Sequence, residues 1–166
     1  MVSFKFVTEK ELDVVRKLAA DIFPQTYGGI ISAEQIEYMM VMMYSEDSLR
    51  RQMSEEGQVF QLICVDGEPC GYFSLQPRTD GIVVLQKLYL LSSMQGKGLG
   101  RAMLDEAVSY VRETYQEATT IQLYVNRENR AKEFYLRYGF SIIATRDNPI
   151  GNGYFMNDYV MEFVVV

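Results

Sequence analysis

The sequence predicts a single α/β domain built around a mixed β-sheet, and three observations lead to this prediction. Apolar residues recur at helical spacing in some segments and alternate or run continuously in others. The predicted order is strand, helices, hairpin, strand, helix, strand, helix, strand, strand, which is not a pure βαβ repeat. The chain has 166 residues and no repeat or linker-like segment, so residues 1–166 are expected to form one domain.

The first part of the chain is predicted to hold a strand followed by helices. Residues 3–8 alternate like a short strand. Thr8 and Glu11 then have the spacing of a capping box, before a helix that Pro24 and Gly28-Gly29 are expected to end. Further helices are predicted from the N-cap Ser32 and over residues 46–55.

A hairpin and a layered second half follow. The dipeptide Asp66-Gly67 is a strong signal for a tight hairpin turn. The run 82–91 is too apolar for an edge strand and predicts a central one. Gly139 is expected to end the last helix in a left-handed conformation. The predicted strands are 59–65, 70–76, 82–91, 121–125, 140–145 and 154–165, and the predicted helices are 99–115 and 129–138.

Composition restricts the class of protein. A net charge of −6 argues against a nucleic-acid binder, which normally carries a basic face. No apolar run approaches the roughly 20 residues that span a bilayer, and the first residues lack the long apolar segment of a signal peptide. We therefore expect a cytoplasmic protein that binds neither nucleic acid nor membrane.

The absence of histidine bears on both metal binding and catalysis. Cys64 and Cys70 are the only cysteines, and two thiols without histidine rarely close a zinc site, so no metal is expected and both are predicted to be reduced core residues on neighbouring strands. Acid–base chemistry must then use Tyr, Glu, Asp, Lys, Cys or water.

The segment Gln95-Gly96-Lys97-Gly98-Leu99-Gly100-Arg101 is the sharpest functional signal. It lies between a predicted strand and a predicted helix, so its backbone N–H groups gather at the positive end of a helix dipole. Glycine lets the backbone approach a bulky anion closely, and Lys97 and Arg101 add positive charge. The pattern predicts a diphosphate site.

The turn has three other possible interpretations. A P-loop requires Gly-Lys-Ser/Thr after its first glycine, and here Gly98 follows Lys97 with no hydroxyl next. A dinucleotide-binding fingerprint requires G-x-G-x-x-G, whereas these glycines are spaced G-x-G-x-G and no acidic residue ends the next strand. A flexible turn without a ligand is the third.

The turn resembles the Q/R-x-x-G-x-G/A signature of GNAT acetyltransferases through Gln95, Gly98 and Gly100. A second block, residues 124–140 with Asn126, Asn129, the Phe134-Tyr135 pair and Gly139-Phe140, is similar to the family's asparagine and Phe-Tyr region. With the matching order of elements, the resemblance covers most of residues 58–146.

This resemblance implies a GNAT-type layered fold, with a mostly antiparallel sheet splayed between its fourth and fifth strands and acetyl-CoA in the gap. It implies that backbone groups of Leu88, Tyr89 and Leu90 pair with the pantetheine arm. It also implies that Asn126 or Asn129 reaches the cofactor. The turn that would hold the pyrophosphate comprises Gln95, Gly96, Lys97, Gly98, Leu99, Gly100 and Arg101.

The resemblance also implies an N-acetyltransferase in which the amine attacks acetyl-CoA directly in a ternary complex. Tyr135 matches the family tyrosine near the CoA sulfur, which makes it the expected general acid, although a core tyrosine is the alternative. Many relatives carry a glutamate where this chain has Gln86 or Tyr124, so the base is open. Gln86 is expected either to hold a water that relays the proton or to have no role.

The acceptor side is less defined. Tyr27, between Pro24 and Gly28-Gly29, is expected in a loop that lines the acceptor cleft. The closing segment 151–162 resembles bacterial polyamine (spermidine/spermine) N-acetyltransferases, which suggests a small cationic amine, with a peptide amine as another possibility. Two alternatives stay open: a catalytically weak acyl-CoA sensor of the same fold, and a nucleotide-binding protein. The apolar ending 163–166 suggests either a homodimer contact or the end of the sheet.

Overall fold

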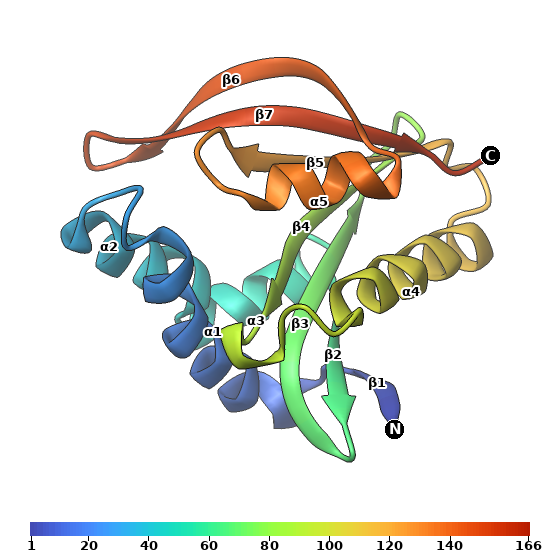
Figure 1. Cartoon of the computed structure of the whole chain (residues 1–166), viewed down its shortest axis with the longest axis horizontal. Helices are drawn as coiled ribbons and strands as arrows, with labels where there is room; N and C mark the ends of the chain where they lie inside the picture. The colour runs from blue at the N-terminus through green and yellow to red at the C-terminus, as the bar shows by residue number, and fades with distance from the viewer.

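The computed structural model describes residues 1–166, and its centre is one seven-stranded sheet with helices on both faces (Figure 1). The strands lie in the order β1-β2-β3-β4-β5-β7-β6, and only the β4–β5 pair is parallel. The predicted mixed sheet, with 82–91 as its central strand, is confirmed. The strands are β1 Val2–Phe6, β2 Val59–Val65, β3 Glu68–Pro77, β4 Ile82–Leu90, β5 Thr120–Asn126, β6 Ser141–Gly151 and β7 Tyr154–Val164.

The helices form two layers because successive strand residues point to opposite faces. Leu62 packs with the first three helices, and its neighbour Ile63 packs with the last two. Each layer therefore has its own hydrophobic core, separated by the sheet. The helices are α1 Leu12–Tyr27, α2 Ala33–Tyr44, α3 Glu46–Ser54, α4 Leu99–Thr114 and α5 Ala131–Tyr138, with short 3-10 turns η1 Glu9–Glu11 and η2 Ser92–Met94.

The predicted capping box at Thr8 and Glu11 is confirmed, but the predicted end of α1 is wrong. Pro24 lies inside the helix, which continues to Tyr27. Pro24 has no N–H to donate to Ala20 O, but Ile22, Phe23 and Tyr27 around it are buried in the core, and this packing holds the helix together across the missing bond. Tyr27 is consequently the last residue of α1 and is 5% exposed, rather than a loop residue.

Two turns follow the sequence pattern closely. Asp66 and Gly67 both have positive φ, 50° and 84°, as a two-residue hairpin of this kind requires. Gly139 ends α5 with a φ of 127°, which is positive, as expected for a glycine in this position. However, α5 begins at Ala131 and not at residue 129, because the Asn129 side-chain oxygen accepts the Ala131 N–H at 2.9 Å and holds the preceding turn.

The sheet opens between β4 and β5, as the resemblance implied. The two strands pair only from Ile82 to Leu85 of β4, opposite Thr120 to Leu123 of β5. At that point β4 carries an irregularity, because Ser74 lies opposite Lys87 and Leu75 lies opposite Leu85, which leaves Gln86 as the extra residue. Such a bulge bends its strand and increases its twist, so the remainder of β4 leaves β5.

The β6–β7 hairpin arches over the open end of the sheet, and its tip comes down beside α2 (Figure 1). Tyr38 of α2 donates its hydroxyl hydrogen to Ile150 O at 2.8 Å, and its ring packs against Tyr154. Gln35, also on α2, donates to Phe155 O at 2.9 Å. These contacts hold the hairpin and the α1–α2 layer on either side of one cleft.

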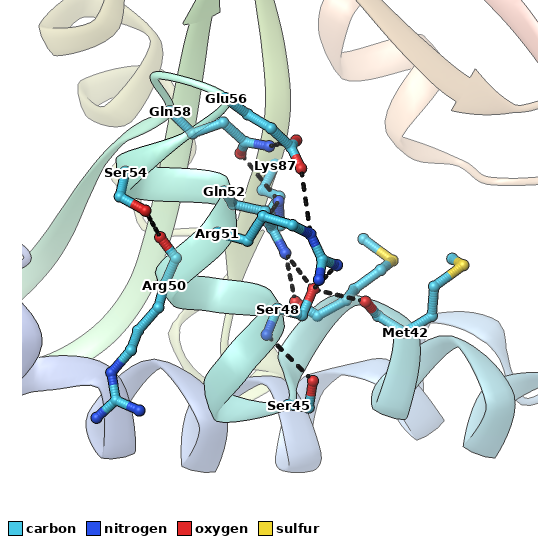
Figure 2. A network of polar contacts seen from close by, with 11 residues as sticks. Met42, Ser45, Ser48, Arg50, Arg51, Gln52, Ser54, Glu56, Gln58 and Lys87 are labelled. Atoms are coloured by element: carbon cyan, nitrogen blue, oxygen red, sulfur yellow. Dashed lines mark hydrogen bonds and ion pairs between the residues drawn. The ribbon is translucent and has the colours of Figure 1, made fainter.

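A buried amine lies under the bulge, in the network shown in Figure 2. Lys87 Nζ is held by the side-chain oxygens of Gln52, at 2.6 Å, and Gln58, at 3.0 Å, and it lies over the Phe60 ring. Lys87 is 4% exposed and makes no ion pair with a carboxylate within 4.0 Å. Burial lowers the pKa of Lys87 from 10.5 to about 7, with Glu56 opposing the shift.

This burial predicts a specific dependence of stability on pH. Between pH 7 and 10.5 the unfolded chain keeps the Lys87 proton that the folded protein has lost. The free energy of unfolding should therefore rise with pH, by about 1.4 kcal/mol per pH unit. The variant Lys87→Met lacks this contribution. Urea unfolding of both proteins from about pH 6 to about pH 9 checks the prediction, and a difference in stability that does not change with pH contradicts it.

Candidate active site

The glycine-rich turn has the backbone of an anion-binding site. Gly96 and Gly98 both have φ +79°, a backbone conformation that residues other than glycine rarely adopt. A Cβ at either position would meet no atom within 4 Å. The N–H groups from Gly96 to Arg101 donate to no atom of the protein. These free donors lie at the N-terminus of α4, where the helix dipole favours negative charge.

The side chains of the turn divide into two groups. Lys97 and Arg101 are exposed, and Arg101 lies over the Tyr138 ring. Leu99 is buried in the core, and Gly100 faces Phe134, whose ring would lie 3.2 Å from a Cβ at this position. Gly100 thus leaves room for Phe134 where α4 packs against α5, whereas Gly96 and Gly98 shape the open turn.

The open edge of β4 presents backbone groups of Leu88 and Leu90. Leu91 N–H donates to Cys70 O at 2.9 Å, and Tyr89 lies opposite Tyr72 in the same register. Hydrogen-bonded pairs alternate along an antiparallel ladder, so Tyr89 directs its N–H and C=O to β3 and its two neighbours direct theirs to the gap. The expectation that the Tyr89 backbone is available is thus corrected.

Gln95 ties the turn to the end of β4. Its side-chain amide donates to Leu90 O at 3.3 Å, and its backbone N–H donates to Ser92 O at 3.3 Å. The Leu90 carbonyl is therefore occupied, while the N–H groups of Leu88 and Leu90 face the gap.

Two tyrosines from different elements meet here, since the hydroxyls of Tyr27, on α1, and Tyr89, on β4, lie 3.0 Å apart. A third tyrosine, Tyr135 on α5, packs against Phe134 and Phe140. Burial raises the pKa of Tyr135, and Tyr27 adds to the shift. The Tyr135 hydroxyl makes no hydrogen bond within the protein, and it is not among the fully buried unpaired atoms. It keeps its proton at neutral pH and can donate it to a ligand.

The two positions where relatives carry a glutamate have other partners here. Gln86 is exposed and donates its side-chain N–H to Gln76 Oε1 at 2.8 Å, which leaves its own oxygen free. Tyr124 lies under the Arg146 guanidinium, 3.4 Å from its ring centroid. Neither side chain is a base at neutral pH.

Asn126 and Asn129 bracket the turn from β5 to α5. Asn126 is 6% exposed, and its side-chain oxygen accepts the Glu128 N–H at 3.0 Å. Asn129 uses its oxygen for the start of α5, as described above. Both oxygens are thus occupied, while neither amide N–H₂ group donates within the protein.

A cleft of about 540 Å³ lies between the α1–α2 turn, the end of β5 and β7. Three of its nine lining residues are apolar and six are polar or charged, a mixture that suits a ligand that is both charged and aliphatic. Its lining residues are Ile30, Ile31, Ser32, Gln35, Asn126, Arg127, Glu128, Phe155 and Asn157. Tyr27, the expected wall residue, is the neighbour of this cleft at the end of α1 and is not part of its lining.

The sequence analysis missed a buried carboxylate, Asp158 on β7. It lies opposite Asn126 of β5 and opposite Arg146 of β6, and its Oδ2 accepts from Arg146 Nε at 3.2 Å. Burial raises the pKa of Asp158, although Arg146 and Arg127 both lower it. Its place in β7 gave no signal in the sequence, because Glu162 on the same strand is also charged.

Comparison with known protein families identifies the family of this chain. Residues 30–163 match the model of the acetyltransferase (GNAT) domain. The chain belongs to this family. It is an acetyl-CoA-dependent N-acetyltransferase.

Relatives agree over most of the chain. A spermidine N(1)-acetyltransferase of Thermoplasma acidophilum is 26% identical over 158 residues, which cover 92% of this chain and 91% of the relative. An uncharacterized N-acetyltransferase of Lactobacillus delbrueckii subsp. lactis is 27% identical over 143 residues, covering 81% and 82%. The crystal structure of PaiA N-acetyltransferase from Thermoplasma acidophilum with coenzyme A has a TM-score of 0.80 at 24% identity, covering 98% of both chains, and shares the fold.

The residues present fit acetyl-CoA. The free N–H groups of the turn match the charge of a diphosphate, and the free edge of β4 offers donors to an amide-containing arm.

No helix of the structure is both long and apolar enough to cross a membrane. No three or more Cys, Asp or Glu side chains gather to bind a metal ion.

Proposed function

We propose that this acetyltransferase acetylates a primary amine of a small cationic acceptor, with polyamines as the first class to test. The observation that carries this proposal is the early end of the β4–β5 pairing, together with a cleft of about 540 Å³ that includes Asn126, the last residue of β5. The similarity to a spermidine N(1)-acetyltransferase supports the acceptor class. The net charge of −6 is compatible with a cationic substrate.

For the cofactor, we assign the pyrophosphate to the N–H groups from Gly96 to Arg101. Lys97 and Arg101 add charge at the rim, and Gln95 and Leu99 position the turn through their contacts with Leu90 and the core. The pantetheine arm is assigned to the open edge at Leu88 and Leu90, with the amide groups of Asn126 and Asn129 across the gap. When bound, acetyl-CoA supplies an activated acetyl group.

Transfer to an amine needs a proton for the departing thiolate and a neutral nucleophile. A thiol has an ordinary pKa of about 8.5, so a hydrogen-bond donor is sufficient to stabilise it as it leaves. We assign this role to Tyr135, whose hydroxyl is free and protonated. Gln86 has a free amide oxygen and is assigned to hold a water near the bulge. Tyr27 is assigned to the inner wall of the acceptor site.

An assay with a panel of amines tests the proposed function. Acetyl-CoA consumption should be faster with spermidine than with a monoamine of similar length or a peptide N-terminus, and a tenfold advantage in kcat/KM corresponds to about 1.4 kcal/mol of additional binding in the transition state. Binding of CoA without consumption by any amine would support the sensor alternative. Equal thermal stabilisation by ATP and by CoA would support the nucleotide-binding alternative.

Tyr135→Phe tests the general acid. The variant should lower kcat by roughly 10²-fold, the low end for proton transfer, and leave the Kd for CoA nearly unchanged. Because burial raises the pKa of Tyr135, its deprotonation should not limit the rate at ordinary assay pH.

The matched control is Tyr138→Phe, on the same helix, which removes a hydroxyl that bonds to Asp105 at 2.8 Å. It should turn over like the wild type. If Tyr135→Phe also retains full kcat, the assignment of Tyr135 is wrong.

A further inference from the structure

The structure contains a buried carboxylate that the assigned roles leave unused, next to a residue of the acceptor cleft. Asp158 is 4% exposed, and Asn126, which lies opposite it in the β5–β7 pair, lines the cleft. Met156, two residues earlier on the same face, packs against the α1–α2 core. The Asp158 side chain therefore points toward α1 and the acceptor side of the sheet.

One oxygen of this carboxylate is available. Oδ2 accepts from Arg146, and Oδ1 accepts from no atom of the protein. The only fully buried side-chain nitrogen or oxygen without a partner is Gln61 Nε2, so Asp158 Oδ1 reaches solvent. Asp158 is not itself a lining residue of the cleft, but its cross-strand neighbour Asn126 is, so a ligand that enters the cleft past Asn126 comes close to this free oxygen.

The charges around Asp158 leave room for a cation. Arg146 of β6 binds it directly, but this guanidinium also stacks on Tyr124. Arg127, which follows β5, donates to the Asp158 backbone oxygen and has its own carboxylate partner, Asp147, at 2.6 Å. From α1, the only titratable neighbour is Tyr27, whose pKa is raised first by burial and then by the charge of Asp158. Glu162 lies further along β7.

We propose that Asp158 is the catalytic base of the transfer: it binds the ammonium group of the acceptor through its free oxygen and removes one proton. This inference rests on the proposed function. The neutral amine then attacks the acetyl carbonyl, a C–N bond forms and the C–S bond breaks. The second proton of the attacking nitrogen goes to the departing thiolate with the help of Tyr135, and Asp158 releases its proton to solvent.

This assignment supplies the catalytic base, for which the chain offers no other candidate at the site. Gln86 and Tyr124 stand where relatives carry glutamates, and the other buried carboxylate, Glu11, belongs to the capping box at the far end of α1. A cross-strand ion pair with Arg146 alone does not require Asp158 to be buried beside a cleft with one oxygen free. A raised pKa also makes a carboxylate a stronger base.

The first experiment compares Asp158→Asn with Asp147→Asn. Both remove one arginine-paired carboxylate from the β6–β7 hairpin, and Asp147 is exposed. With an acceptor amine that is protonated at the assay pH, Asp158→Asn should lower kcat/KM by roughly 10²- to 10³-fold at unchanged CoA affinity. Asp147→Asn should behave like the wild type. Equal activity of Asp158→Asn and wild type overturns the proposal. A wild type that acetylates no amine overturns the proposed function instead.

A second measurement separates the base from a merely structural ion pair. A β,β-difluorinated acceptor is largely neutral at the assay pH, so no ammonium proton has to be removed before the amine attacks. With it, Asp158→Asn should recover to within a few-fold of wild type. A defect of the same size with both acceptors means that Asp158 only supports the structure, and overturns the proposal.

If Asp158→Asn does not fold, the wild-type pH profile decides. With Asp158 as base, the reactive combination is ionised Asp158 with the ammonium form, so kcat/KM is level between the Asp158 pKa and the acceptor pKa of about 10. A kcat/KM that climbs tenfold per pH unit up to the acceptor pKa shows that water removes the proton before binding, and overturns the proposal.

Discussion

The early end of the β4–β5 pairing is the constraint on which the rest of the structure depends. Parallel pairing stops at Leu85 and Leu123, where Gln86 enters β4 as an extra residue. Beyond this point two strand edges face each other without bonding, and unpaired backbone groups are costly unless a partner satisfies them. This is why we propose the gap as the binding site: a ligand with amide groups could supply the hydrogen bonds that the missing ladder would have made.

The elements around the gap keep it open while closing its ends. The glycine turn and α4 place a row of free N–H groups at one end. At the other end, hydrogen bonds from Gln35 and Tyr38 hold the β6–β7 hairpin against α2, so both sides of the cleft are fixed in place. The bulge itself rests on the buried Lys87, which joins β4 to α3 and β2 through two glutamines. Charge is thus buried on both sides of the gap, at Lys87 and at Asp158, and both sites carry a pKa displaced by desolvation.

Local chemistry allowed most of the architecture to be predicted from sequence. The period of apolar residues, the Asp66-Gly67 turn and the spacing of Gly96 and Gly98 each act within a few residues of chain. The errors arose where tertiary packing overrides local preference: Pro24 is accommodated within α1, and the Tyr89 backbone is already used by β3. Asp158 was missed for a related reason, because its burial beside a cleft depends on β5, β6 and α1 meeting around it. No local pattern carries that information.

The central claim is that acetyl-CoA occupies the gap beside β4 with its diphosphate on the turn. Backbone amide chemical shifts of the full chain, recorded during titration with CoA, test it most directly. We predict the largest shifts at Leu88, at Leu90 and from Gly96 to Arg101, because these are the N–H groups without a partner in the protein. Unchanged shifts at these amides, with changes clustered instead in the groove of α4 beside Asp105 and Tyr138, would contradict the account.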